Sequence, residues 1–150
     1  MNKDYILGID TSAYTTSISV VDINGNIIYD IRKKLDVPLG SIGLRQQEAI
    51  FQHLKNIPEN LNKLNINFNK ISTISISSAP RNVYNSYMPV FLVGKNFGQV
   101  LCKACNANLV EYSHQEGHIA AALIDYYNNI EDTFLTIHIS GGTTEFLLTN

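Results

Sequence analysis

The sequence predicts an α/β fold in which helices flank a mixed β-sheet. The first observation is an opening meander: residues 5–11, 15–23 and 27–34 are apolar or alternating, and Gly25 supplies a turn. The second is that helical and strand-like stretches alternate after residue 44. A strand meander followed by such alternation is typical of a mixed sheet with helices on its faces.

The elements expected after the meander follow from hydrophobic spacing and from breaker residues. Pro58 is expected to end the first helix, and the asparagine-rich stretch at 56–69 to form a solvated linker. The elements are, in order, a helix at 44–57, a strand at 71–77, a helix at 90–105, a strand at 108–112, a helix at 114–127, and strands at 134–139 and 145–148.

A weak internal repeat predicts two lobes. Residues 5–22 read YILGIDTSAYTTSISVVD and residues 134–149 read FLTIHISGGTTEFLLT, so each holds two apolar strands around a loop of small residues. The period is too long for a solenoid and fits a duplicated fold; a chance likeness of two hairpins is the alternative. We expect residues 1–130 to form the first lobe and residues 131–150 to open a second lobe whose remainder belongs to a longer protein.

Composition narrows the classes of function. Of the 150 residues, 45% are apolar and 16% charged, which suits a folded domain, and the net charge of -2 excludes a global basic field for nucleic acid. No stretch reaches the roughly 18 apolar residues of a membrane span, and the opening leaves no room for a signal peptide. We therefore expect a cytoplasmic protein, in which Cys102 and Cys105 are reduced core residues of a helix.

His114 and His118 stand four residues apart in an expected helix. This spacing places both imidazoles on one helix face, where they could bind one metal ion. Glu116 points away from that face and suits a cap or an outer-shell role. Two surface histidines near a helix start are the alternative. His138 lies on a nearby strand, and its alternation with apolar neighbours leaves open whether it faces the pair.

Two short turns are candidates for binding phosphate. They are Asp10-Thr11-Ser12 and Ser140-Gly141-Gly142-Thr143-Thr144. Glycine-rich turns let backbone N–H groups approach phosphate oxygens closely, and Asp10 could also serve a magnesium ion or a water. Ordinary hairpin turns are the alternative for both.

Two further clusters have a structural and a functional interpretation. The basic run Arg32-Lys33-Lys34 lies at a strand end, where it would discourage aberrant pairing of a sheet edge or contact RNA. The loop at 79–90 carries aromatic and sulfur side chains that could line a ligand cleft or simply cover the lobe. These side chains are Tyr84, Tyr87 and Met88.

Three segments, in order and at suitable spacing, resemble the threonylcarbamoyl-transferase family (TsaD or Gcp, also described as glycoprotease-like or peptidase M22). LGIDTSAYTTSISVVD is similar to the family's opening. LVGKNFGQVLCKACNANLVEYSHQEGHIAAAL is similar to its helix, strand and H-x-E-G-H motif, and FLTIHISGGTTEFLL to its S-G-G-x-T hairpin. The likeness runs along nearly the whole chain and identifies it as the N-terminal half of a family member.

The resemblance implies an actin-like ATPase fold (the ASKHA, ribonuclease H-like class), of which this chain would form one lobe. It implies one divalent metal, Fe or Zn, held by His114 and His118, with an aspartate of the C-terminal half as third ligand. It also implies ATP or threonylcarbamoyl-adenylate between the lobes, with Ser140, Gly141 and Gly142 near the phosphate or carbamoyl side. The implied partners are a TsaB-like paralogue or a second copy, and tRNA, with no DNA and no membrane.

Family members move a threonylcarbamoyl group from its adenylate to adenine 37 of tRNAs that read ANN codons, and the metal would act as a Lewis acid. The older peptidase description gains no support here, because the motif reads HQEGH and not H-E-x-x-H. The 150-residue chain alone is expected to be inactive.

Several loops depart from the family pattern. The acids that usually follow the first Thr-Ser are absent at 13–16, and Thr143 replaces a histidine. Gly-Pro-Gly is replaced by Ala79-Pro80-Arg81-Asn82, and Arg-x-His reads Arg45-Gln46-Gln47. Bulky residues at 79–82 would block a close backbone approach to a ligand. The sequence therefore predicts a divergent paralogue, and a non-catalytic TsaB-like scaffold and a small-molecule kinase of the actin-like superfamily stay open as alternatives.

Overall fold

The computed structural model describes residues 3–124, 126, 133–140 and 143–149. The chain divides into two compact units, Met1–Gln115 and Glu116–Asn150. This division lies before residue 130, the lobe boundary that the sequence suggests.

Every helix and strand expected from the sequence is present and in the expected order. The first unit contains β1 (Tyr5–Ser12), β2 (Thr15–Asp22), β3 (Ile27–Lys34), α1 (Gln46–Leu61), a 3-10 turn (Phe68–Lys70), β4 (Ile71–Ala79), α2 (Phe91–Cys105) and β5 (Asn108–Ser113). Helix α3 (His114–Leu123) starts where this unit ends, and the second unit continues with β6 (Phe134–Ser140) and β7 (Thr143–Thr149).

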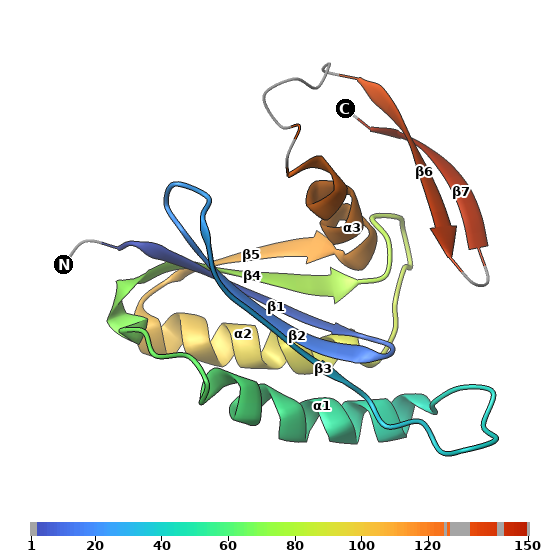
Figure 1. The fold of residues 1–150 in the computed structure, drawn as a ribbon, viewed down its shortest axis with the longest axis horizontal. Helices are drawn as coiled ribbons and strands as arrows, with labels where there is room; N and C mark the ends of the chain where they lie inside the picture. Colours follow the sequence, from blue (N-terminus) through green and yellow to red (C-terminus); the bar gives the residue numbers. More distant parts are fainter. Residues whose placement is uncertain (1–2, 125, 127–132, 141–142, 150) are drawn as a thin grey trace. The chain divides into compact units, whose positions relative to one another are not determined.

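Five strands of the first unit form a mixed sheet in the order β3-β2-β1-β4-β5 (Figure 1). β1 pairs antiparallel with β2, and β2 with β3, as the meander predicts. β4 lies parallel to β1, and β5 lies parallel to β4 with α2 as the crossover between them. The carboxyl ends of β1, β4 and β5 therefore meet at one edge of the sheet.

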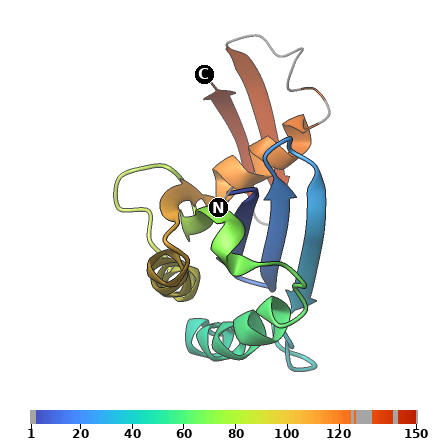
Figure 2. The ribbon, with the colours of Figure 1, turned by 90° about the vertical axis from the view of Figure 1, so that its left-hand side faces the viewer.

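One face of this sheet carries the main hydrophobic core. Its buried side chains alternate along the strands and are Leu7 and Ile9 of β1, Ile18 and Val20 of β2, and Ile74 and Ile76 of β4. Both long helices cover this face: α1 contacts β2 and β3, whereas α2 contacts β1, β4 and β5. Figure 2 views α2 nearly end-on, beside α1. Residues that alternate with the core, among them Asp10 of β1 and Ser77 of β4, point to the opposite face, which matters for the site described below.

Two glycines let α2 lie close to the strands. A Cβ atom at Gly94 would meet Thr11 Oγ1 at 3.0 Å, and one at Gly98 would meet Ile76 Cγ2 at 2.7 Å. The two glycines are four residues apart, so they share the helix face that contacts β1 and β4. The close approach of α2 to the sheet therefore requires the absence of a side chain, and it requires this more strictly at Gly98 than at Gly94.

Helix α1 continues past Pro58, so the prediction that this proline ends the helix is wrong. The last turn is held by burial: Ile57 and Asn60 are fully buried, and Asn60 Nδ2 donates to the Thr16 carbonyl at 3.4 Å. These contacts offset the helical hydrogen bond that a proline removes. The asparagine-rich stretch is therefore not a solvated linker at its start, where Asn56 and Asn60 face the core.

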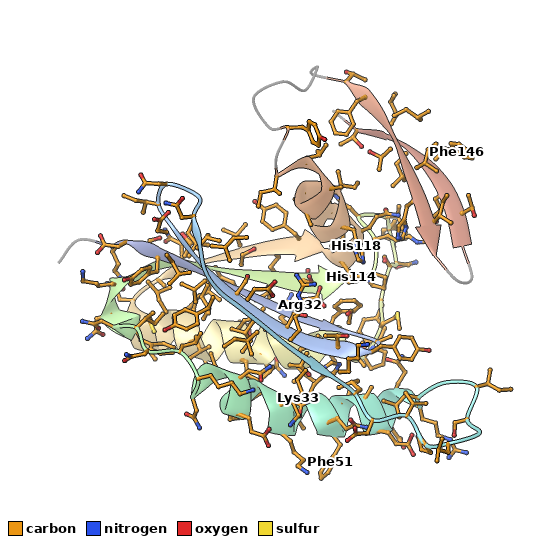
Figure 3. The ribbon with its side chains drawn as sticks, in the orientation of Figure 1. Arg32, Lys33, Phe51, His114, His118 and Phe146 are labelled. Carbon is orange, nitrogen blue, oxygen red and sulfur yellow. The ribbon has the colours of Figure 1, made fainter. Side chains whose placement is uncertain are left out.

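The basic run lies on β3, which is an edge strand of the described sheet. Arg32 forms an ion pair with Asp30 at 2.8 Å, and Lys33 forms one with Glu59 of α1 (Figure 3). Two of the three cations are thus neutralised by neighbouring acids. This agrees with the structural interpretation of the run as a charged sheet edge.

Cys102 and Cys105 are core residues, as expected. Cys105 is buried among the apolar side chains under the sheet, and Cys102 is half-buried with its Sγ 3.4 Å from the Asn108 carbonyl. Burial raises the pKa of both thiols. A thiol of raised pKa is little ionised near neutral pH and is a weak nucleophile, so the pair has a packing role.

In the second unit β6 and β7 form an antiparallel hairpin in which His138 lies directly opposite Glu145. Its large exposed apolar side chains are Leu135, Ile137, Ile139, Phe146 and Leu148 (Figure 3). A two-stranded hairpin buries little apolar surface by itself. Across the part of the chain that the structure describes, no helix is both long and apolar enough to cross a membrane.

Replacing Gly98 by alanine should lower the free energy of unfolding by about 1–3 kcal/mol, because the added methyl group would overpack against Ile76. Gly117→Ala is the matched control. Gly117 also lies in a helix, but a Cβ atom there would meet nothing within 4 Å, so alanine should leave stability equal or slightly raised. Urea denaturation followed by circular dichroism measures both variants. Equal stabilities would contradict the close approach of α2 to the sheet.

Candidate functional site

The carboxyl ends of the parallel strands bring Asp10, Ser77 and His114 together. Asp10 lies near the end of β1, Ser77 lies near the end of β4, and His114 directly follows β5. Ile9 and Ile76 pair in register on the buried face, so the residues that follow them point to the opposite face. Polar groups at the carboxyl ends of strands are where open α/β sheets bind their ligands.

The Asp10 carboxylate accepts three hydrogen bonds. Oδ2 accepts from Ser77 Oγ at 2.5 Å and from His114 Nδ1 at 2.8 Å, and Oδ1 accepts from the Ser12 backbone N–H at 2.8 Å. Burial alone would raise the pKa of Asp10. The hydrogen bond and charge of His114 and the bonds from Ser77 and Ser12 outweigh burial and lower this pKa to about 2. Asp10 is therefore an anion at neutral pH.

His114 is oriented by this carboxylate. An ionised carboxylate only accepts hydrogen bonds, so His114 donates its Nδ1–H to Asp10. Nε2 is then the ring nitrogen that can accept a proton or bind a metal. The adjacent backbone is held too, because the Gln115 N–H donates to the Pro80 carbonyl at 3.1 Å. A carboxylate that fixes an imidazole in this way is the usual outer-shell partner of a metal-bound histidine.

A buried histidine of α1 holds the turn between β1 and β2. His53 is fully buried, with Nε2 3.0 Å from the Ser12 carbonyl and Nδ1 2.8 Å from Thr16 Oγ1. A carbonyl oxygen only accepts, so Nε2 carries the proton and Nδ1 accepts from the Thr16 hydroxyl. Asn56 Nδ2 donates to the same Thr16 oxygen at 3.2 Å. Helix α1 therefore fixes both ends of the turn.

Ser12 joins these two sets of contacts. Its N–H donates to Asp10 and its carbonyl accepts from His53. A continuous series of hydrogen bonds therefore runs through the first unit from His53 to Ser12, then to Asp10, and then to His114. The position of the His114 ring depends in this way on the packing of α1.

Thr11 has different partners. It is fully buried, and its hydroxyl donates to the Val90 carbonyl at 2.9 Å and accepts from the Gly94 N–H at 3.2 Å. The Thr11 side chain thus fastens the start of α2 to β1. In the structure, Asp10, Thr11 and Ser12 form their hydrogen bonds with other residues of the protein. Nucleotide binding by these three residues stays a prediction.

The second candidate turn is described only at its ends. Ser140 and Thr143 pair in the ladder between β6 and β7, and Thr144 lies exposed on β7 opposite Ile139. Gly141 and Gly142 lie outside the described residues. The predicted role of this turn beside a phosphate group therefore stays a prediction.

The second unit brings His118 and His138 together. The ring of His118 on α3 stacks on the ring of His138 on β6, with centroids 5.6 Å apart and planes inclined by 29°. His138, whose orientation the sequence left open, therefore faces His118. Within the described ranges, no three His, Cys, Asp or Glu side chains are grouped closely enough to hold a metal ion by themselves. Metal binding by His114 and His118 stays a prediction.

The loop at 80–89 covers the lobe through one of its three side chains, whereas the lining of a ligand cleft by the two tyrosines stays a prediction. Met88 packs against a small buried cluster, so it covers the lobe. Tyr84 and Tyr87 are 95% and 62% exposed. The members of the cluster are Leu35, Ala49, Val90 and Phe91.

Three residues of the site, His53, Asn56 and Ser77, were not predicted from the sequence. Ser77 follows Ile76 at the end of the predicted strand, so alternation along the strand was a signal that could have placed Ser77 on the same face as Asp10. His53, Asn56 and Asn60 are spaced by three and four residues, which is the helical period of a buried stripe. Their polar side chains concealed this signal, because buried polar residues are uncommon.

No protein-family model matches the chain. Among curated proteins, the chain is 31% identical over 147 residues to a tRNA N6-adenosine threonylcarbamoyltransferase of Orientia tsutsugamushi (strain Boryong), with 95% of this chain and 41% of that protein covered. A protein of the same name from Thermosipho melanesiensis is 29% identical over 146 residues, covering 95% and 43%. One from Clostridium kluyveri is 30% identical over 151 residues, covering 96% and 42%. The chain thus spans about two fifths of the length of these relatives.

Solved structures share the fold at low identity. YeaZ from Pseudomonas aeruginosa has a TM-score of 0.54 at 11% identity, over 96% of this chain and 64% of that one. EutJ from Carboxydothermus hydrogenoformans has a TM-score of 0.53 at 16% identity, over 99% and 48%. A putative sugar kinase from Cytophaga hutchinsonii has a TM-score of 0.52 at 17% identity, over 97% and 47%. The predicted α/β fold of the actin-like, ribonuclease H-like class is confirmed.

Lowering the pH from about 7.5 to about 5.5 should reduce the free energy of unfolding, and His53→Gln should weaken that dependence. Burial lowers the pKa of His53, against smaller opposing effects of the Ser12 carbonyl and the Asp10 charge. The unfolded chain then takes up a proton near pH ~6.5 that the folded chain does not. The stability that neutral His53 contributes is complete above that pH and is lost as the pH falls toward the lowered folded-state pKa.

Denaturant titrations of the two proteins at several pH values measure this effect. His53→Gln is also expected to be less stable at every pH, because a buried hydrogen-bond partner is lost. Only the slope against pH tests the titration. Equal slopes in the variant and the wild-type chain would contradict the assignment.

Proposed function

We propose that the chain belongs to the tRNA N6-adenosine threonylcarbamoyltransferase family, to whose members it is 29–31% identical over 95–96% of its length, and that it forms the N-terminal, metal- and nucleotide-binding part of a threonylcarbamoyl-transferase-like protein. The whole protein would transfer a threonylcarbamoyl group to tRNA. The chain spans about two fifths of the length of its relatives, so the transfer activity is proposed for the longer protein.

The hydrogen bond between Asp10 and His114 is the observation that carries this proposal. Withdrawing a carboxylate even partly from water is costly unless hydrogen bonds compensate for the lost hydration. Here Ser77 and Ser12 hold the carboxylate, and it in turn fixes the tautomer of His114. Such an arrangement orients Nε2 of His114 toward a ligand. A histidine that only packs at a helix start would not need its tautomer to be fixed.

His114 and His118 would hold one divalent ion, Fe or Zn. Imidazole suits both metals, the spacing of four residues on α3 suits two ligands on one helix face, and Asp10 is the outer-shell carboxylate that such ligands usually have. When bound, the ion would position and polarise the acyl-phosphate group of the adenylate as a Lewis acid. Asp10 keeps the Nδ1 proton of His114 in place, so that Nε2 stays directed to the ligand.

ATP or threonylcarbamoyl-adenylate would be bound by the two short turns. The turn after β1 is held by His53 and Asn56 through Ser12 and Thr16, and a rigid turn loses little conformational entropy when a ligand binds. The glycines of the other turn would give backbone N–H groups access to phosphate oxygens. The residues proposed for this role are Asp10, Thr11, Ser12, Ser140, Gly141, Gly142 and Thr144.

A paralogue of the same fold, of the TsaB-like type, or a second copy of the chain would complete the assembly. The likeness to YeaZ supports such a partner at the level of fold. tRNA would be the macromolecular substrate, which places the proposed reaction in the cytoplasm. The net charge of -2 gives this chain little general attraction for RNA, so the partner or the rest of the protein would supply that affinity.

A non-catalytic partner of a true transferase is the second candidate, and the loop at 80–89 favours it. Ala79-Pro80-Arg81-Asn82 stands where the family pattern has Gly-Pro-Gly, and Tyr84 is exposed in the same loop. Side chains of this size leave less room for the backbone to approach a ligand. The two candidates share the fold and differ in whether the chain takes part in the transfer.

The full-length protein purified without oxygen should contain one Fe or Zn ion per chain, and His118→Ala should lose it. Asp10→Asn should weaken zinc binding by about 10–100-fold, because it removes the outer-shell carboxylate from His114. Asp30→Asn is the matched control, since Asp30 pairs with Arg32 on the edge strand β3, and it should bind zinc normally. Elemental analysis and calorimetric titration measure these quantities. A wild-type chain without stoichiometric metal, or equal losses in the two aspartate variants, would count against the proposal.

Deletion of the gene should lower the content of N6-threonylcarbamoyladenosine in tRNA, measured by mass spectrometry of tRNA digests. The gene with Asp30→Asn should restore the modification, whereas His118→Ala should not, because it lacks a proposed metal ligand. Unchanged modification after the deletion, with a separate transferase present, would instead assign the chain to the non-catalytic role.

A further inference from the structure

The loop between β4 and α2 presents two aromatic rings to solvent. Tyr84 is 95% exposed and Tyr87 is 62% exposed, whereas Met88 of the same loop packs in the lobe. A single exposed apolar side chain is ordinary on a protein surface. Two tyrosines three residues apart form a larger aromatic surface, which has no part in the hydrogen bonds of the candidate site.

Both ends of this loop are tied to the strands that carry the candidate site (Figure 1). At its start, the Pro80 carbonyl accepts a hydrogen bond from the N–H of Gln115, the residue after the site histidine, at 3.1 Å. At its end, the Val90 carbonyl accepts a hydrogen bond at 2.9 Å from the hydroxyl of Thr11, the residue after the site aspartate. The loop therefore begins and ends at the edge of the sheet where the site lies, within the first unit.

The loop is folded on itself. The Arg81 N–H donates to Ser86 Oγ at 3.0 Å, and the Ser86 N–H donates to the Val83 carbonyl at 3.1 Å. Asn85 has a φ of 61°, in the left-handed region that asparagine tolerates. The backbone that carries the two tyrosines is thus ordered by local bonds, so a ligand that binds them has little ordering entropy to overcome.

An unpaired nucleobase suits this aromatic surface. Proteins bind single-stranded RNA by stacking its bases on aromatic side chains, and every base has a flat face for such contacts. In the sequence, no acidic residue lies between Glu59 and Glu111. The loop therefore carries no charge that would repel the phosphate groups of RNA.

The proposed reaction supplies such a base. The N6 amine of adenine takes part in base pairing, so an enzyme that modifies it acts on an unpaired base or takes the base out of the stack. A base that leaves its stack, and the bases next to it, lose stacking partners that aromatic side chains can replace. Open α/β sheets bind their ligands at the carboxyl ends of the strands, which is where this loop lies. The position of the loop therefore favours the RNA substrate over a protein segment as its ligand.

We propose that Tyr84 and Tyr87 form a stacking platform for an unpaired base of the RNA substrate. The inference rests on the proposed function and deepens it by naming a part of this chain that contacts tRNA. Stacking does not require phosphate contacts, so the platform agrees with the low net charge of the chain. The platform would place a base, while general affinity for tRNA would come from a partner or from the rest of the protein.

NMR titration of the 150-residue chain with an RNA hairpin tests the platform directly. The hairpin has a single-stranded loop that contains adenine, and the tyrosines of the chain are isotopically labelled. Ring currents of a stacked base should shift the ring resonances of Tyr84 and Tyr87, whereas those of Tyr29, which packs against the core, should stay in place. A fully paired RNA duplex of the same stem offers no unpaired base and should leave all three unchanged.

Variants separate stacking from folding. Tyr84→Ala should weaken binding of the RNA hairpin by about tenfold or more, whereas Tyr84→Phe keeps the ring and should bind as the wild-type chain does. Phe51→Ala is the matched control, because Phe51 is also an exposed aromatic residue, 65% exposed, but lies on α1. The loss in Tyr84→Ala should be the same at low and at high salt, since only contacts to phosphate release counterions.

Three results would overturn the inference: tyrosine resonances that do not move with the RNA hairpin, equal shifts with the paired duplex, or equal binding by Tyr84→Ala and Tyr84→Phe. The proposed function would stand in each case if the full-length protein still holds its metal and restores the tRNA modification. Tyrosine shifts with the hairpin, together with unchanged modification after deletion of the gene, would instead overturn the proposed transfer and support an RNA contact in the non-catalytic candidate.

Discussion

The candidate site depends on the half-buried carboxylate of Asp10. Asp10 accepts hydrogen bonds from Ser12 at the end of β1, from Ser77 of β4 and from His114 at the start of α3. Withdrawing an ion from water without such donors would cost several kcal/mol, so the carboxylate and its donors fix one another. The bond to the Asp10 carboxylate gives His114, at the start of α3, a defined tautomer. Changes near Asp10 therefore act on the orientation of His114 as well as on stability.

Strand register sets which residues serve the core and which serve the site. Neighbouring residues of β1 point to opposite faces, so Thr11 fastens α2 while Asp10 binds His114. A slip of one residue would exchange these roles. The pairing of Ile9 with Ile18 in the core is therefore also a requirement of the site. Helix α1 adds a second restraint through His53, which holds the turn that contains Ser12.

The sequence was sufficient for the elements and their order, because hydrophobic spacing decides where helices and strands form. The sequence identified Asp10 and His114 as candidate site residues. It did not predict the hydrogen bond between them, because that bond depends on the parallel register of three strands. The prediction that α1 ends at Pro58 was wrong, because buried contacts in the last turn stabilise the helix beyond the proline. His53 was not predicted because its buried partners are far away in sequence. The orientation of His138 toward His118 could not be predicted because it depends on the register of the hairpin.

The net charge of this chain does not favour binding of a large nucleic-acid substrate such as tRNA. Affinity for a nucleic acid grows with the number of phosphates that Lys and Arg neutralise. Here the chain carries a net charge of -2, and Arg32 and Lys33 are already paired with Asp30 and Glu59. An RNA phosphate would have to displace these acids. The proposed role of the chain is therefore to orient a metal and a nucleotide, and tRNA would be held by a partner or by the part of the protein that its longer relatives possess.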